Sequence, residues 1–272
     1  MNDKLTIPCE SCGDEFEPVI LEALGVNRVS STLCYKCRKD KREELEKIEQ
    51  AKANNETVKR KERWLKVSGI PIRFRGVSFE TFIDRGFNTK KIKDVCLDYV
   101  MSFPLVSGGD YKSLVIASPG SWGVGKTHLV CSIGKKVIER WIRTSQESPI
   151  LYLTEPTLFR RLRATFNREY DKETELDVFN HLIEVPLLIV DDIGKEEVSD
   201  ARFVQRVWFS VINGRYDNML PVVLTANLTA DEMANHLGGS RNNEAAFDRL
   251  LEMTGGVFWE LNGTSKRQEN NE

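Results

Sequence analysis

Apolar positions along the chain fall into short unbroken runs separated by runs at helical spacing. The unbroken runs are rich in β-branched residues, as is typical of parallel strands that are buried on both faces. They cover residues 113–117, 149–154, 186–194, 221–227 and 257–261. Because helical runs separate them, we predict an α/β fold with a parallel sheet.

Helices are predicted where apolar residues recur every three or four positions. Such runs lie at residues 92–100, 129–141, 158–166, 203–212 and 245–251. Residues 38–66 differ, because they mix acidic and basic residues, lack Gly and Pro, and have a thin apolar stripe at Leu45, Ile48 and Ala51. The simplest interpretation is a solvated helix that links two domains.

A phosphate-binding loop pattern, G-x-x-x-x-G-K-[ST], is matched by Gly120, Gly125, Lys126 and Thr127. With Gly123, these glycines let backbone N–H groups turn toward phosphate oxygens, and the next helix adds the positive end of its dipole. Lys126 would contact the β- and γ-phosphates, and the Thr127 hydroxyl would hold magnesium. A strand before the loop and a helix after it make an ordinary glycine-rich turn a poor alternative.

Polar residues end two of the predicted strands. Asp191 and Asp192 lie where a parallel sheet places its ligands, so we expect Asp191 to hold magnesium and Asp192 to orient and deprotonate the attacking water. The alternative is a strand that ends in a polar turn. The Asn227 amide would hydrogen-bond the γ-phosphate and that water. The alternative for Asn227 is a helix N-cap region before Asp231.

Four cysteines form two tight pairs, Cys9-x-x-Cys12 and Cys34-x-x-Cys37. Each pair can direct two thiolates at one tetrahedral zinc, and few apolar residues between the pairs are available to hold a fold without metal. With all four positions filled by cysteine, the zinc would be structural, although four unrelated thiols are the alternative. Cys96 and Cys131 stand alone and are expected to be small buried hydrophobes.

The composition is that of an ordinary soluble globular protein, with 40% hydrophobic and 29% charged residues in 272. The formal net charge of −2 offers no global attraction to nucleic acid, so any basic surface must be local. No apolar run approaches a membrane span, and the first residues lack a signal peptide's apolar core. We therefore expect a cytoplasmic protein without a membrane partner.

Two basic stretches are candidates for binding single-stranded DNA. Residues 59–66 are basic with one aromatic, Trp64, which would stack on a base, although a solvated charged face is the simpler interpretation. The helix near Pro156 carries a row of arginines that would track a strand's backbone if several subunits lined them up around a central channel, although a solvated face is the usual interpretation. These are Arg160, Arg161, Arg163 and Arg168.

Several motifs in order resemble the AAA+ ATPases of the DnaC/DnaI helicase-loader group and their IstB-like transposition relatives. The resemblance covers about residues 69–261. It is carried by Gly-Ile-Pro-x-Arg-Phe-Arg at 69–75, Gly-x-Gly-Lys-Thr-His-Leu at 123–129, Leu-Leu-Ile-Val-Asp-Asp-Ile-Gly at 187–194, Asn-Gly-Arg-Tyr at 213–216, Thr-Ala-Asn at 225–227 and Phe-Asp-Arg-Leu at 247–250.

The resemblance implies a three-layer P-loop domain in which the strand ending at Asn227 lies between the P-loop and Asp191 strands. It implies that Asn227 is the sensor and that Arg249 is an arginine finger for a neighbouring subunit's ATP, although a surface ion pair is the alternative for Arg249. It also places Gly120, Gly123, Val124 and His128 in the nucleotide site. The implied domains are a zinc domain at 1–40, a helical linker at 41–67 and an AAA+ ATPase domain at 68–272.

Three departures from the family pattern stand out. Asp192 replaces the glutamate common among AAA+ proteins, and its shorter arm would slow hydrolysis. Trp122 is bulky for a P-loop position, and too few residues follow Arg249 for a separate helical lid.

The resemblance implies a loader that uses ATP, magnesium and zinc. Its subunits would assemble, grip a DnaB-type replicative helicase through the N-terminal part, bind single-stranded DNA and release on hydrolysis. One alternative is an IstB-like transposition ATPase that acts with a transposase on duplex DNA. Another is a zinc-dependent DNA-binding scaffold that uses ATP as a switch.

Overall fold

The computed structural model describes residues 6–23, 26–84, 86–104, 111–166, 173–194, 201–238 and 245–265. The chain divides into two compact units, Met1–Lys59 and Arg60–Glu272, which are described separately below as unit 1 and unit 2. Within the described ranges, no helix has both the length and the apolar character that a membrane span requires.

Unit 1 contains two small antiparallel ladders and most of one long helix. β1 (Ile7–Pro8) pairs with β2 (Glu15–Phe16), and β3 (Ile20–Ala23) pairs with β4 (Val26–Val29). The helix α1 (Tyr35–Val67) follows and covers the charged stretch, so the prediction of a helix there is confirmed. Its last two turns belong to unit 2.

Unit 2 is built on a five-stranded parallel sheet with the order β6-β7-β8-β5-β9. Its strands are β5 (Leu114–Ala117), β6 (Ile150–Thr154), β7 (Leu187–Ile193), β8 (Val222–Ala226) and β9 (Phe258–Glu260). All five predicted strand runs are confirmed. The strand that leads to Asn227 lies between the P-loop strand and the Asp191 strand, as the resemblance implied.

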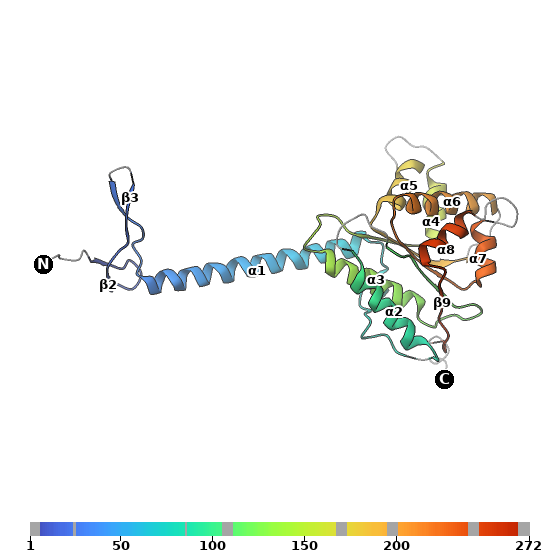
Figure 1. The fold of residues 1–272 in the computed structure, drawn as a ribbon, viewed down its shortest axis with the longest axis horizontal. Coiled ribbons are helices and arrows are strands. Elements are labelled where there is room, and N and C mark those ends of the chain that lie inside the picture. Colours follow the sequence, from blue (N-terminus) through green and yellow to red (C-terminus); the bar gives the residue numbers. More distant parts are fainter. Residues whose placement is uncertain are drawn as a thin grey trace. The chain divides into compact units, whose positions relative to one another are not determined.

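Helices cover both faces of this sheet (Figure 1). After a single 3₁₀ turn, η1 (Ile72–Phe74), they are α2 (Thr89–Ser102), α3 (Lys126–Trp141), α4 (Glu155–Ala164), α5 (Glu175–Glu184), α6 (Ala201–Asp217), α7 (Ala230–Leu237) and α8 (Ala245–Thr254). One core cluster joins α2 and α3 to the sheet, and another joins α4 to α8 to its opposite face. The α/β three-layer prediction is therefore confirmed.

Alternate strand residues supply the two cores. Ile116 and Ile189 belong to the core under α2 and α3, while Val115, Leu188 and Val190 belong to the other. Because both faces are covered, these side chains are fully buried, which explains why the strands are unbroken apolar runs. Cys96 and Cys131 are free and buried in the first core, as predicted.

The last two turns of α1 pack into unit 2. Trp64 is 1% exposed within the core that holds α3. The Arg60 guanidinium donates to the Ile142 carbonyl at 3.0 Å, and Lys61 forms a 2.6 Å ion pair with Glu139. The idea that Trp64 stacks on a DNA base is therefore wrong, because its indole is part of the protein core.

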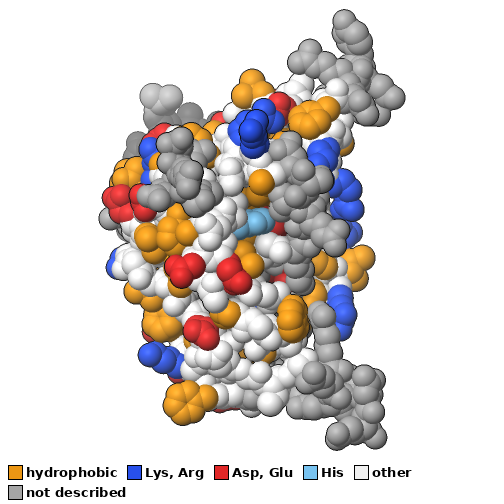
Figure 2. All heavy atoms as spheres, turned by 90° about the vertical axis from the view of Figure 1, so that its right-hand side faces the viewer, with side chains coloured by type: hydrophobic (Ala, Val, Ile, Leu, Met, Phe, Trp, Pro, Cys, Tyr) orange, Lys and Arg blue, Asp and Glu red, His pale blue; other side chains and the backbone are white. Residues whose placement is uncertain are grey.

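One face of unit 2 shows how its charges are distributed. In Figure 2, acidic side chains lie near the middle of this face, lysines and arginines lie along its edges, and hydrophobic side chains are scattered between them. A surface that attracts DNA would therefore have to be a local feature, as the net charge of −2 predicts.

Candidate nucleotide site and zinc centre

The loop between β5 and α3 has the backbone that phosphate binding requires. Gly120, Gly123 and Gly125 have φ of +65°, +77° and +107°, in the left-handed region that favours glycine. At Gly125 an added Cβ would also lie 2.6 Å from the Phe82 ring. The 16-residue helix α3 begins directly after this glycine, so its N-terminus points at the loop. Trp122 is 59% exposed, so its bulk does not fill the loop.

Lys126, the first residue of α3, is brought to the end of β8. Its side chain is buried, and Nζ donates to Asn227 Oδ1 at 2.5 Å and to Ser118 Oγ. Ser118, fully buried after β5, donates in turn to the Ser121 carbonyl at 2.9 Å. The predicted phosphate-binding lysine and the predicted sensor thus lie side by side. Ser118 was missed by the sequence analysis.

Thr127 and Asp191, the predicted magnesium ligands, are in direct contact. Thr127 Oγ1 donates to Asp191 Oδ2 at 2.8 Å, and the Tyr152 hydroxyl donates to the same oxygen at 2.7 Å. Thr225 Oγ1 donates to Asp191 Oδ1. Burial raises the pKa of the Asp191 carboxyl above its usual value, although these three donors favour its ionised form. A hydroxyl and a carboxylate are the oxygen ligands that magnesium prefers.

Tyr152 and Thr225 are further residues that the sequence analysis missed. They lie on β6 and β8, the two strands that flank β7, and both are buried. The signal for them was present, because each is a polar residue inside an otherwise apolar strand run. Their hydroxyls hold both carboxylate oxygens of Asp191, which fixes the direction of that side chain.

Asp192 lies in an unusual backbone conformation. Its φ is +61°, and the pairing of β7 with β8 is irregular between Val190 and Ile193. The Asp192 N–H donates to Thr225 Oγ1 at 2.9 Å instead of continuing the ladder. A residue with a side chain in this region costs on the order of 1–3 kcal/mol, and such strain is concentrated at functional sites. Asp192 is partly exposed, whereas Asp191 is 1% exposed.

The contacts of the remaining predicted site residues near the loop say less about nucleotide binding. Val124 is buried in the loop, and the His128 ring packs edge-on against Phe82 with its Nε2 2.8 Å from the Ser78 carbonyl. His128 therefore joins the loop's helix to the segment before α2, and its contact with nucleotide stays a prediction. Asn227 is not the N-cap of the next helix, because Thr229 caps α7.

Arg249 lies on α8, where its guanidinium rests on aromatic rings of α6. It is 5.6 Å from the centre of the Phe209 ring and 5.7 Å from that of Tyr216. Its Nη1 is buried and has no hydrogen-bond partner among the described residues. The ion pair offered as the alternative is absent from the described contacts, and the finger role stays a prediction.

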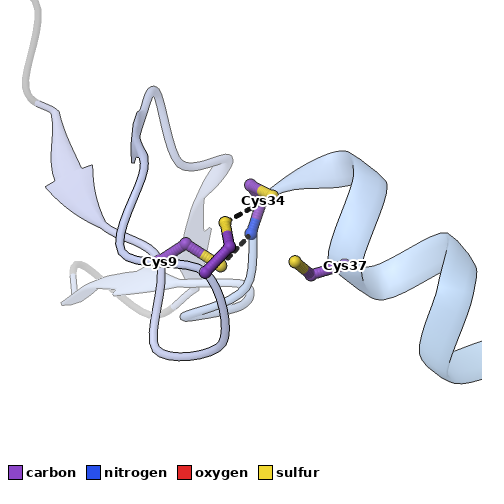
Figure 3. A group of neighbouring side chains, drawn as sticks. Cys9, Cys34 and Cys37 are labelled. Atoms are coloured by element: carbon purple, nitrogen blue, oxygen red, sulfur yellow. Dashed lines mark hydrogen bonds between the residues drawn. The ribbon is translucent and has the colours of Figure 1, made fainter.

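The four paired cysteines converge in unit 1. Their sulfurs all lie within 4.8 Å of one another, and those of Cys12 and Cys34 are 3.8 Å apart. Figure 3 shows Cys34 and Cys37 reaching toward Cys9 from the start of α1. A tetrahedral zinc with bonds of about 2.3 Å separates its sulfurs by about 3.8 Å, so this donor set fits zinc.

The surroundings of the cluster support metal binding. The Cys34 N–H donates to Cys9 Sγ at 3.2 Å, and this bond lowers the pKa of the Cys9 thiol to about 6, which favours the thiolate that metals bind. The pKa values of the neighbouring Cys12 and Cys37 thiols are raised, because desolvation and the adjacent cysteines disfavour further negative charge in the cluster. Among the described side chains of unit 1, Cys9 is the one that is buried, so the described part of that unit has no apolar core. A bound metal would supply the missing stability.

Replacing Cys34 by serine is expected to abolish zinc binding and unfold unit 1. Wild-type protein should contain about one zinc per chain, and the variant essentially none. Zinc content by mass spectrometry of metals and the loss of β-structure in unit 1 by NMR are the measurements. Cys96→Ala, which changes a cysteine of unit 2, is the control and should keep its zinc. Full zinc content in Cys34→Ser would contradict the assignment.

A glycine loop between a parallel strand and a helix, a lysine that starts the helix, and paired aspartates two strands away in the sheet define a P-loop nucleotide-binding domain. With the order of its sheet, this is the AAA+ form of the fold. The chain belongs to the IstB-like ATP-binding protein family, whose model matches residues 28–272.

The known relatives include both an insertion-sequence protein and a replicative helicase loader. A protein of insertion sequence IS5376 from Geobacillus stearothermophilus is 33% identical over 150 residues, 54% of this chain and 53% of that protein. The replicative helicase loader DnaI of Bacillus subtilis is 29% identical over 125 residues, 46% of this chain and 37% of DnaI. The chain thus spans about half or less of the length of these two relatives.

The fold is also that of solved helicase loaders. The crystal structure of the DnaC helicase loader superposes with a TM-score of 0.55 and 20% identity, over 71% of this chain and 100% of that chain. The superposition shows that the described sheet and helices form the AAA+ fold of that loader.

Proposed function

We propose that this chain is an ATP-dependent loader that delivers a DnaB-type replicative helicase to single-stranded DNA, with ATP binding and hydrolysis controlling assembly and release. The observation that carries the ATP-dependent part is the joining of Lys126 to Asn227 and of Thr127 to Asp191 at one edge of the sheet. The likeness to DnaI in sequence and to the DnaC loader in fold supports the loader part.

Each group at this edge has a task in ATP hydrolysis. The loop amides and Lys126 bind the β- and γ-phosphates. The bound phosphates take the place of Asn227 and Ser118 as hydrogen-bond acceptors of the lysine. Magnesium held by Thr127 and Asp191 would neutralise charge on the phosphate oxygens. Asp192 and Asn227 orient the water that attacks the γ-phosphorus, and Asp192 takes its proton as the bond to the ADP oxygen breaks. Arg249 of a neighbouring subunit stabilises the transition-state charge.

We assign the binding of the helicase to unit 1, which contains the proposed zinc site. For single-stranded DNA we assign the arginines of α4, of which Arg161 is bound to Glu173 and Arg163 lies 5.3 Å from the centre of the Phe203 ring. Arg160 shares that helix, and Arg168 lies outside the described residues. Assembly of several copies would align these cations along a strand.

A second candidate function is transposition, because the insertion-sequence relative is 33% identical to this chain. In that case the partner is a transposase and the substrate is duplex DNA. Affinity purification of the tagged chain from its own cells, followed by identification of co-purifying proteins, separates the two. A replicative helicase supports the loader, and a transposase together with ATP-dependent filaments on duplex DNA supports transposition. Recovery of neither would count against both, in favour of a DNA-binding scaffold.

Lys126→Ala is expected to weaken ATP binding roughly 10- to 100-fold, because it removes a charged hydrogen-bond donor to phosphate. Binding of a fluorescent ATP analogue with magnesium present measures this effect. Lys136→Ala is the matched control on the same helix, since Lys136 is partly exposed and pairs with Glu139 instead of facing the loop. Equal affinity of the Lys126→Ala variant and the wild-type chain would overturn the nucleotide site.

A further inference from the structure

A buried carboxylate close to the aspartate pair has no role in the function described so far. Glu155 is the first residue of α4 and is fully buried. Removing a carboxylate from water is costly unless it is hydrogen-bonded, so a group like this needs an explanation. Its place in the first turn of a helix is favourable for a negative charge but does not explain its contacts.

Glu155 contacts three polar groups from three different parts of unit 2. Its Oε2 accepts from the Gly194 N–H at 2.7 Å, just after β7. Its Oε1 accepts from the Trp208 indole of α6 at 2.8 Å and lies 2.6 Å from the His236 ring of α7. The two oxygens of Glu155 therefore have different partners. Oε2 contacts a backbone amide, and Oε1 contacts two side chains.

The backbone amide lies two residues beyond Asp192. Asp192 has φ of +61°, and its own N–H is held by Thr225. The backbone that carries this strained residue is thus fixed on one side by Thr225 and on the other by Glu155 through Gly194. Strained conformations persist when the surroundings over-determine them, and these two bonds do so.

We propose that Glu155 is a positioning residue for Asp192. Through Oε2 it holds the turn after β7, so that the Asp192 carboxylate faces the attacking water. Through His236 it ties this turn to α7, the helix that follows Asn227, and so keeps the two water-orienting residues in register. This inference rests on the proposed hydrolysis of ATP.

Glu155→Gln tests the role, because the Gly194 N–H and the Trp208 indole both donate to Glu155 and an amide NH₂ cannot accept from either. If the amide oxygen of the new glutamine faces Trp208 and His236, its NH₂ faces Gly194, and the Gly194 N–H then has no acceptor. A misplacement of about 1 Å costs on the order of 100-fold in rate, so we expect kcat to fall about 10- to 100-fold with the Kd for ATP nearly unchanged. Steady-state hydrolysis, ATP titration and thermal unfolding are measured on the full chain.

Trp208→Phe is the matched control. It removes one hydrogen bond to the same carboxylate but leaves Oε2 on Gly194, so its kcat should stay near that of the wild type. A fall in kcat equal to that of Glu155→Gln, or a parallel loss of ATP affinity in Glu155→Gln, would show that Glu155 supports only general packing, and the proposal would fail.

Two further outcomes are distinguishable. If Glu155→Gln does not fold, Glu155→Asp keeps a carboxylate with a shorter reach to Gly194. A lower kcat with unchanged ATP affinity then supports the positioning role, and an unchanged kcat overturns it. A wild-type chain that binds ATP but never hydrolyses it would overturn the proposed function itself, and the positioning role with it.

Discussion

Replacing Arg249 by alanine is expected to lower the assembly-dependent rate of ATP hydrolysis about 1,000-fold or more, which is the usual contribution of an arginine finger. The guanidinium rests on the rings of Phe209 and Tyr216, and its buried Nη1 has no described hydrogen-bond partner. A cation held by aromatic faces and without an anion is well suited to accept a neighbour's phosphate. The measurement is the rate per subunit as a function of protein concentration.

Mixing two inactive variants tests whether Arg249 acts across subunits. Arg249→Ala keeps its nucleotide loop, and Lys126→Ala keeps its arginine, so mixed assemblies contain sites with both groups. We expect the mixture to recover part of the wild-type rate. Absence of recovery, with both variants folded and assembled, would show that Arg249 does not serve a neighbouring site. An unchanged rate in Arg249→Ala alone would have the same meaning.

Asp192→Asn is expected to reduce hydrolysis about 100- to 10,000-fold while ATP binding persists, because it removes the proposed general base. The substitution suits this position, since asparagine tolerates the left-handed backbone, in which Asp192 has φ of +61°. Asp192→Ala is the informative comparison: it also removes the base but adds about 1–2 kcal/mol of backbone strain. Both variants should lose kcat, but Asp192→Ala should also unfold at a lower temperature. Undiminished hydrolysis by Asp192→Asn would favour a scaffold that uses ATP as a switch.

The parts of the fold that were predicted correctly depend on local patterns. Each buried strand is an apolar run, and the P-loop motif spans only a few residues between β5 and α3. Helix α5 was not predicted, and α7 was considered only as the helix near Asp231 in the alternative for Asn227. Both begin with a capping box, Thr174 with Asp177 and Thr229 with Glu232, so a local signal was present and was passed over.

The parts that were missed depend on register between distant strands. Tyr152 and Thr225 reach Asp191 from 39 and 34 residues away, on strands that are neighbours of β7 in the sheet. No periodicity within a single segment specifies such pairs. Ser118 is different, because it is eight residues from Lys126 and belongs to the same loop. The strand order itself came from the resemblance, and the bulge at Asp192 needs coordinates to be seen.

The burial of Trp64 decides where unit 2 can be separated from the rest of the chain. A shortened protein that starts at Gly69 would lack this indole and leave a hole beside Ile70 in the core that supports α3. Deleting a buried tryptophan side chain typically costs 3–5 kcal/mol, roughly a third or more of a domain's stability. A shortened protein that starts at Arg60 keeps the indole, together with the contacts of Arg60 and Lys61 to α3 and the turn after it.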